Sequence, residues 1–303
     1  MTGTTEHTTK GVRSLEVRAT GPQTTVQDLG RRGLAALGVG TSGAADERSL
    51  RLGNRLLGNQ EGTAALEVTF GGLEVRAHGG MFVAVTGATS PMTVEGRPVG
   101  HAAVTWVPDG ATLRLGPAAS GLRSYLAVRG GIDVPPVLES RSTDTLAGLG
   151  PAVPAVGDHL PVGPAPRADI TVDVAPVAAP AAGEIILRVV PGPRTDWFTD
   201  ESLAALLSTP YEVTSESDRV GMRLSGRALE RARDGELSSE GMVTGALQVP
   251  PTGQPTLFLA DHPVTGGYPV IGVVVTDDIA LAAQAQPGQR LRFVRAGRGT
   301  HGS

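Results

Sequence analysis

Apolar and polar residues alternate along many short stretches of this chain, and Gly or Pro ends most of them. Alternation with a period of two places successive side chains on opposite faces of a β-strand. Short strands separated by turn residues favour barrels or sandwiches over a doubly wound sheet. We therefore predict a mainly β protein, with clear strands at residues 15–19, 81–85, 111–115, 185–190 and 289–293.

Helical patterns are few. The best one covers residues 45–57, where Ser42 or Asp46 is suited to cap the start and Gly58-Asn59 to end the helix. The fold class is thus mainly β with a few short helices. Shorter helices are predicted at residues 201–207, 227–233 and 278–285.

The composition changes most clearly between residues 161 and 183, which are rich in Pro and Ala. Proline is excluded from helix interiors and from central strands. We therefore predict a linker or crossing segment at 166–183 between two β modules, an N-terminal one at 12–165 and a C-terminal one at 184–297. Modules of this length are ordinary domains.

Two reactive residue types are nearly missing from the 303 residues. The chain has no Cys, and Lys10 is the only lysine among 26 Lys and Arg residues. A thiolate nucleophile and Cys-bound zinc are therefore excluded. Lys10 lies outside any Gly-rich loop, so a phosphate-binding P-loop is not predicted either. Because there is also no HExxH pattern, we predict no metal site.

The charge balance bears on partners and location. A net charge of −4 and a pI near 5.9 argue against binding to nucleic acid or to an anionic membrane. The longest apolar runs are far shorter than the roughly 20 residues of a membrane span. The Thr-rich start has no apolar segment typical of a signal peptide. We therefore expect a soluble, cytoplasmic protein.

Four Gly-bounded polar clusters are candidates for a binding site. In the first, Asp28 and Arg31 can brace a turn, and Ser42-Gly43 before the first helix can present backbone N–H groups to an anion. Gln27 belongs to the same stretch. The structural alternative is a β-turn followed by a helix cap.

In the second cluster, Arg141 and Ser142 lie in a Ser/Arg/Thr run whose donors suit a phosphate or carboxylate. A solvated loop is the alternative. In the third, Arg219 and Arg223 are suited to hold a carboxylate, and Asp218 and Glu240 are candidate bases. A surface network of ion pairs explains the same residues.

The fourth cluster combines an acid, an imidazole and a phenol in one loop. Asp261, His262 and Tyr268 are candidates for proton transfer, and Thr265 with Gly266-Gly267 offers hydroxyl and N–H donors. The structural alternative is a turn at the end of a strand, with Tyr268 packed over it.

The clusters occur in segments that together resemble a known family. These segments include VQDLGRRG, YLAVRGGIDVPPVLESRSTDTLAGLG, VVPGPRTDWF, SDRVGMRLSG, SEGMVTGALQVPPTGQP and DHPVTGGYPVIGVV. In this order they resemble the biotin-dependent carboxyltransferase-like family. It includes allophanate hydrolase subunit 2, the C subunit of 5-oxoprolinase and the C-terminal part of the urea carboxylase carboxyltransferase domain.

The resemblance implies two cyclophilin-like β-barrel modules and a companion subunit 1, also called the B subunit and itself cyclophilin-like, with the active site at the junction. The pattern departs from the family at two points. Ala44-Ala45 follow Ser42-Gly43 where the family has Pro and Met, and Val270 follows the Tyr268-Pro269 pair where a lysine is common.

The resemblance implies the C subunit of an ATP-dependent 5-oxoprolinase, which opens a cyclic amide together with the B subunit and a third, the A subunit. ATP would act through the complex. Arg219, Arg223 and the amides of Gly266-Gly267 would then stabilise oxyanion or phosphate charge, with Asp261, His262 or Tyr268 moving protons.

Two alternatives remain open. One is an allophanate hydrolase subunit 2 or a carboxyltransferase component that acts on urea-like substrates. Biotin is attached through a lysine of a carrier domain, which is missing here, so it would be carried by another chain. The other alternative is a non-catalytic regulator that binds subunit 1.

Overall fold

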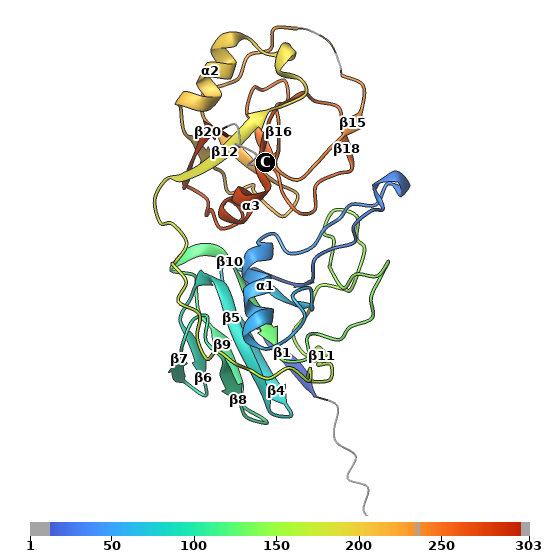
Figure 1. Cartoon of the computed structure of the whole chain (residues 1–303), viewed down its shortest axis with the longest axis vertical. Helices are drawn as coiled ribbons and strands as arrows, with labels where there is room; N and C mark the ends of the chain where they lie inside the picture. Colours follow the sequence, from blue (N-terminus) through green and yellow to red (C-terminus); the bar gives the residue numbers. More distant parts are fainter. Residues whose placement is uncertain (1–12, 234, 236, 298–303) are drawn as a thin grey trace, which may run out of the picture.

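A computed structural model describes residues 13–233, 235 and 237–297 (Figure 1). Lys10 and the first residue of the predicted N-terminal module lie outside these ranges. None of the helices in the described part is long and apolar enough to cross a membrane.

The N-terminal part consists of two antiparallel sheets. One has the strand order β11-β1-β4-β9-β6-β7, and the other has the order β2-β3-β10-β5-β8. The bounds are β1 Ser14–Thr20, β2 Gln23–Gln27, β3 Ala65–Thr69, β4 Leu73–His78, β5 Met81–Thr89, β6 Met92–Val94, β7 Arg97–Val99, β8 Thr105–Val107, β9 Thr112–Leu115, β10 Ser120–Val128 and β11 His159–Pro161.

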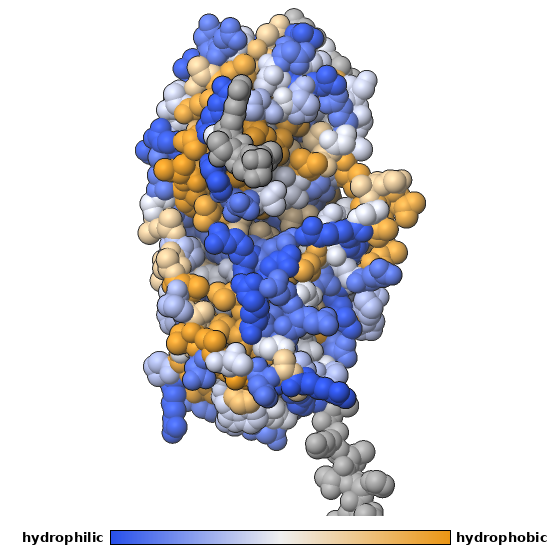
Figure 2. Space-filling model, in the orientation of Figure 1, coloured by the Kyte–Doolittle hydropathy of each residue, from blue (hydrophilic) through white to orange (hydrophobic). Residues whose placement is uncertain are grey.

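The core of this part lies between the two sheets. Alternate residues of each strand face it, as the two-residue period predicts: Leu15 and Val17 of β1 are buried in the same cluster as Val83 and Val85 of β5. Helix α1 (Glu47–Leu56) covers the other face of the five-stranded sheet, where Leu50 packs with residues of β5 and β10. In Figure 2, hydrophilic residues gather in the middle of the molecule, where α1 lies.

The C-terminal part is a closed barrel with the strand order β12-β19-β16-β17-β14-β13-β20. A short two-stranded sheet, β15 with β18, lies outside it. The bounds are β12 Ile185–Pro191, β13 Tyr211–Val213, β14 Gly221–Ser225, β15 Glu240–Gly241, β16 Ala246–Gln248, β17 Thr256–Phe258, β18 Thr265–Gly266, β19 Val270–Val274, β20 Arg290–Arg295, α2 Asp200–Ser208 and α3 Thr276–Ala282. Two 3-10 turns, η1 (Ala35–Leu37) and η2 (Thr195–Trp197), complete the elements.

The predicted mainly β class with a few short helices is confirmed, and so are the five predicted strands. Three of the four predicted helices form, as α1, α2 and α3. The prediction of a helix at residues 227–233 is wrong. Its backbone bonds to other segments instead: Leu229 N donates to Gly253 O, and Ala232 N donates to Trp197 O. Tertiary pairing overrides the weak helical propensity of this stretch.

Candidate functional site

A buried polar group joins the two halves of the chain, and we call it the junction cluster. Its centre is Arg219, just before β14, which pairs with Asp261 just after β17. The two side chains form a double contact, with Nη2 to Oδ1 at 2.9 Å and Nε to Oδ2 at 3.0 Å. The N-terminal half supplies the remaining members. The cluster consists of Ser42, Glu67, Tyr125, Thr145, Arg219 and Asp261.

Two residues of the N-terminal half donate hydrogen bonds to the Asp261 carboxylate. Ser42 Oγ donates to Oδ1 at 2.7 Å, and Thr145 donates to Oδ2 through its N–H at 2.9 Å and its hydroxyl at 2.7 Å. Since Asp261 is only 1% exposed, its carboxylate is enclosed by protein donors. The arrangement holds two loops of the N-terminal half against the barrel.

A second carboxylate balances Arg219. Glu67 on β3 contacts its Nη1, while the Nη2 atom also donates to the Gly43 carbonyl at 2.6 Å. Tyr125 on β10 donates to Glu67 Oε2 at 2.7 Å. Ala45 N donates to the same oxygen at 3.0 Å. The Arg219 guanidinium thus lies between one carboxylate from each half of the chain.

The electrostatics keep Asp261 and Arg219 ionised. Burial alone would raise the pKa of Asp261, but the charge and hydrogen bonds of Arg219, with those of Ser42 and Thr145, lower it below its usual value. Burial would lower the pKa of Arg219, yet Glu67 and Asp261 raise it above its usual value. Burial, followed by the charges of Glu67 and Asp46, raises the pKa of Tyr125 well above that of a free phenol.

The first two polar clusters of the sequence meet around Asp28. Its Oδ1 accepts from Ser140 Oγ at 2.7 Å, and its Oδ2 accepts from Arg141 N at 2.6 Å. Ser142 Oγ also donates to Oδ1. Arg141 itself turns outward to Asp133, at 2.7 Å. Asp28 therefore fixes the loop that leads to Thr145 in the junction cluster.

Gln27 and Arg31 donate hydrogen bonds to the backbone of the same loop. Gln27 Nε2 donates to Thr143 O at 2.9 Å, and the buried Arg31 donates to Ser142 O. Ser42 and Gly43 adopt positive φ angles of 52° and 99°. A Cβ at Gly43 would lie 2.9 Å from Gly30 N, so the close approach of these two loops requires glycine.

The third and fourth clusters meet in the short sheet beside the barrel. Glu240 of β15 pairs directly with Gly266 of β18. The Glu240 carboxylate is bound by Arg194, with Nε to Oε1 at 2.9 Å, and the hydrogen bond from Arg194 lowers its pKa. Tyr268 is 45% exposed, and the Arg231 guanidinium lies 5.7 Å from its ring centre.

His262 lies between the junction cluster and this short sheet. Its Nδ1 is 2.8 Å from Pro263 O, and its ring stacks on Phe258 with centres 6.0 Å apart. Its own carbonyl lies close to Gly40, and so does Asp144 Oδ2. Loops from both halves of the chain therefore meet next to the His262 backbone.

Two of the candidate residues lie apart from these groups. Arg223 on β14 has an exposed side chain near Glu216, so it does not form a fork with the buried Arg219. Asp218 Oδ1 accepts from the N–H groups of Val220 and Gly221 and thereby closes a local turn.

The sequence matches a family of carboxyltransferase domains, described as subdomain A and B, over residues 37–295. The chain belongs to this family. Within it, the chain is 38% identical to the 5-oxoprolinase C subunit of Escherichia coli (strain K12), over 93% of this chain and 91% of that protein. It is 33% identical to the urea amidolyase of Saccharomyces cerevisiae, over 93% of this chain but 16% of that protein.

A solved member of the carboxyltransferase family has the same architecture. The crystal structure of the Kluyveromyces lactis urea amidolyase superposes with a TM-score of 0.89 at 30% identity, covering 94% of this chain and 19% of that chain. The family resemblance stated from sequence is thereby confirmed.

Four residues of this site, Glu67, Tyr125, Thr145 and Arg194, are not among the candidates predicted from sequence. Glu67 is a charged residue within the otherwise apolar run Ala64–Val68, and this mismatch was the available signal. Tyr125 and Arg194 gave no signal that could place them, because their partners are distant in the sequence.

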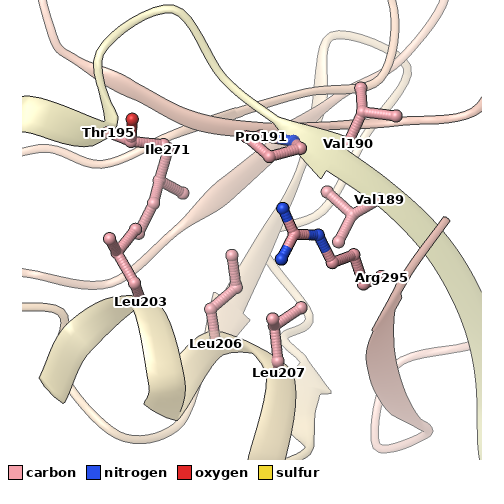
Figure 3. Close-up of a pocket in the computed structure, with 10 residues that line it drawn as sticks. Val189, Val190, Pro191, Thr195, Leu203, Leu206, Leu207, Ile271 and Arg295 are labelled. Atoms are coloured by element: carbon pink, nitrogen blue, oxygen red, sulfur yellow. The ribbon is translucent and has the colours of Figure 1, made fainter. Parts of the chain in front are cut away.

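Two cavities of the described residues lie outside these groups. One, of about 650 Å³, lies between α1, α3 and residues 177–181. The other, of about 260 Å³, lies between α2 and the barrel strands, with Arg295 beside the apolar residues that line it (Figure 3). Neither is lined by Glu240, Asp261, His262 or Tyr268.

Proposed function

We propose that this chain is the C subunit of an ATP-dependent 5-oxoprolinase-type complex, which hydrolyses a cyclic amide. The observation that carries the proposal is the 38% identity to a protein named as the C subunit of 5-oxoprolinase, because the match spans 91% of that protein. A second protein of that name, from Haemophilus influenzae, is 35% identical over 87% of its length.

The proposal includes partner subunits. A protein named as a C subunit implies others, and we assign a companion B subunit and a third, the A subunit, to this chain. ATP acts at the level of the complex, since this chain has no lysine for a phosphate loop beyond Lys10. We place the complex in the cytoplasm, where ATP is available.

The geometry supports separate roles for the candidate residues. Asp261 is enclosed and held ionised by Arg219, which suits positioning of the adjoining loop. The side chain of His262 is partly exposed and that of Tyr268 is exposed. Both are therefore accessible to a substrate and are assigned to proton transfer. The N–H groups near Gly267 and the hydroxyl of Thr265 are assigned to the developing oxyanion.

The test is reconstitution with the A and B subunits. The complex with ATP and 5-oxoproline is expected to release glutamate and ADP in equal amounts. Tyr268→Phe and His262→Gln should each lower kcat at least about tenfold, since general acid–base groups contribute about 10²–10⁴-fold. Arg223→Gln, on the exposed face of β14, is the matched control and should keep full activity.

A complex that assembles but makes no glutamate would overturn the proposal.

The match to urea amidolyase favours a second candidate, a carboxyltransferase component for urea-like substrates with biotin on another chain. The same protein given a carboxylated biotin carrier and urea would then transfer the carboxyl group from the biotin nitrogen to a urea nitrogen, which releases carboxylated urea and free biotin.

A further inference from the structure

Two imidazoles and one carboxylate meet on the outer face of the six-stranded sheet. They belong to three neighbouring strands, β11, β1 and β4. His159 on β11 lies directly opposite Glu16 on β1, and His78 on β4 lies opposite Ser14, one side chain further along the same face. The alternation of β1 turns Leu15 and Val17 into the core, so Glu16 faces outward.

The three side chains point toward one another. His78 Nε2 lies 2.8 Å from Glu16 Oε2, and the two imidazole rings have centres 4.9 Å apart with a tilt of 46°. One ligand atom of each residue lies within 4.8 Å of those of the other two. Because the positions come from adjacent strands, the sheet itself fixes their separation.

Ser14, Arg18 and Arg76 are the polar neighbours of these three side chains. Ser14 Oγ lies 3.4 Å from His159 Nδ1, and an Nδ1–H donated to it leaves Nε2 as the ligand atom. Arg76, the cross-strand neighbour of Glu16, turns away and donates to Gly110 O at 3.0 Å. Only Arg18, at 3.2 Å from Glu16 Oε1, forms an ion pair with this carboxylate among the described arginines.

We propose that Glu16, His78 and His159 form a binding site for a divalent transition-metal ion, with zinc as the ion to test. Two imidazoles and one carboxylate are a ligand set that zinc accepts, and a water molecule completes the tetrahedron. Since the three residues are part-exposed or exposed, that fourth position opens to solvent.

This site is independent of the proposed function. It lies on β1, β4 and β11, whereas Glu67 and Tyr125 of the junction cluster lie on the other sheet. The bound ion would tie β11, a three-residue edge strand, to β1 and β4. Because this strand immediately precedes the segment that crosses to the barrel, the ion would anchor the start of that segment.

Calorimetric titration of the EDTA-treated protein with Zn²⁺ tests the proposal. One ion per chain is expected at pH 7.5, together with a higher melting temperature when zinc is present. Glu16→Gln, His78→Ala and His159→Ala should each weaken binding at least about tenfold, because each removes a direct ligand. Each variant should also lose most of the zinc-dependent rise in melting temperature.

Two controls test three of the four histidines outside the triad. His101→Asn changes a histidine that is not part of the triad, and a His7→Ala, His301→Ala variant removes those near the two ends of the sequence. Both should bind zinc as the wild type does. Melting of every variant in EDTA shows whether it folds. The proposal is overturned if the folded wild type binds no zinc in the micromolar range, or if the triad variants bind it unchanged.

Discussion

Arg219 is a fully buried cation, and its two carboxylate partners come from opposite halves of the chain. Removing one partner of a buried ion pair costs about 3–5 kcal/mol, because the other charge stays desolvated. We expect Asp261→Asn to lower the free energy of unfolding by about 3 kcal/mol, the low end of that range, since Glu67 remains in place. Urea unfolding measures the change.

The matched control for this substitution is Glu216→Gln, which removes the carboxylate near Arg223 on the exposed face of β14. Exposed ion pairs contribute about 0–1 kcal/mol, so this variant should unfold almost like the wild type. A loss for Asp261→Asn no larger than that of the control would show that the junction cluster does not stabilise the fold.

The lowered pKa of Asp261 predicts a specific dependence on pH. Because the folded-state pKa is below the unfolded value of about 3.9, the carboxylate stabilises the fold above that pH and loses its effect as pH falls through the folded pKa. The difference in unfolding free energy between wild type and Asp261→Asn should stay constant from about pH 8 to 5. It should shrink below about pH 4, when urea unfolding is repeated there. A difference that persists unchanged at pH 3 would contradict this assignment.

At the scale of elements, periodicity located five of the strands and the three helices, because these depend on residues that are neighbours in sequence. It failed at residues 227–233, where the backbone pairs with Gly253 and Trp197. The same limit applies to the site. The Asp28 turn follows from a local Asp-Leu-Gly pattern, whereas the pairing of Arg219 with Glu67 joins residues that are 152 positions apart.

Thr199 and Asp46 both cap a helix, but only Asp46 also bonds to the other half of the chain. Thr199 caps α2 by accepting from Ser202 N at 3.2 Å, and Thr199→Ala should cost about 1 kcal/mol. Asp46 caps α1 through Ser49 N at 3.0 Å and also accepts from Gln284 of the barrel at 2.8 Å. Asp46→Ala should therefore cost about 3 kcal/mol, as a cap and a charged hydrogen bond are both lost. If urea unfolding gave the same loss of unfolding free energy for Thr199→Ala and Asp46→Ala, the Gln284 contact would contribute nothing to stability.

At the scale of the whole molecule, polar contacts join the halves at more than one place. The junction cluster is one, and Gln284 is another. Its Oε1 accepts from the N–H groups of Leu122 and Arg123 at 2.9 and 3.1 Å, and its Nε2 donates to Asp46. Arg123 also donates to Ala283 O at 2.6 Å. Because buried polar groups must stay paired, these contacts favour one relative position of the two halves.

This coupling makes the unfolding of the two halves interdependent, and the two tryptophans of the chain can report it separately. Trp106 lies on β8 and packs against Phe82, while Trp197 lies in η2 against the barrel core. Trp197→Phe leaves Trp106 as the fluorescent reporter of the N-terminal half, and Trp106→Phe leaves Trp197 as the reporter of the barrel.

In the otherwise native protein, the fluorescence of both variants should give the same urea midpoint, since each half loses its polar partners when the other unfolds. Adding Arg219→Ala to each should separate the two midpoints, whereas adding Arg223→Ala should leave them coincident. Midpoints that differ before the junction is altered would show that the halves unfold independently.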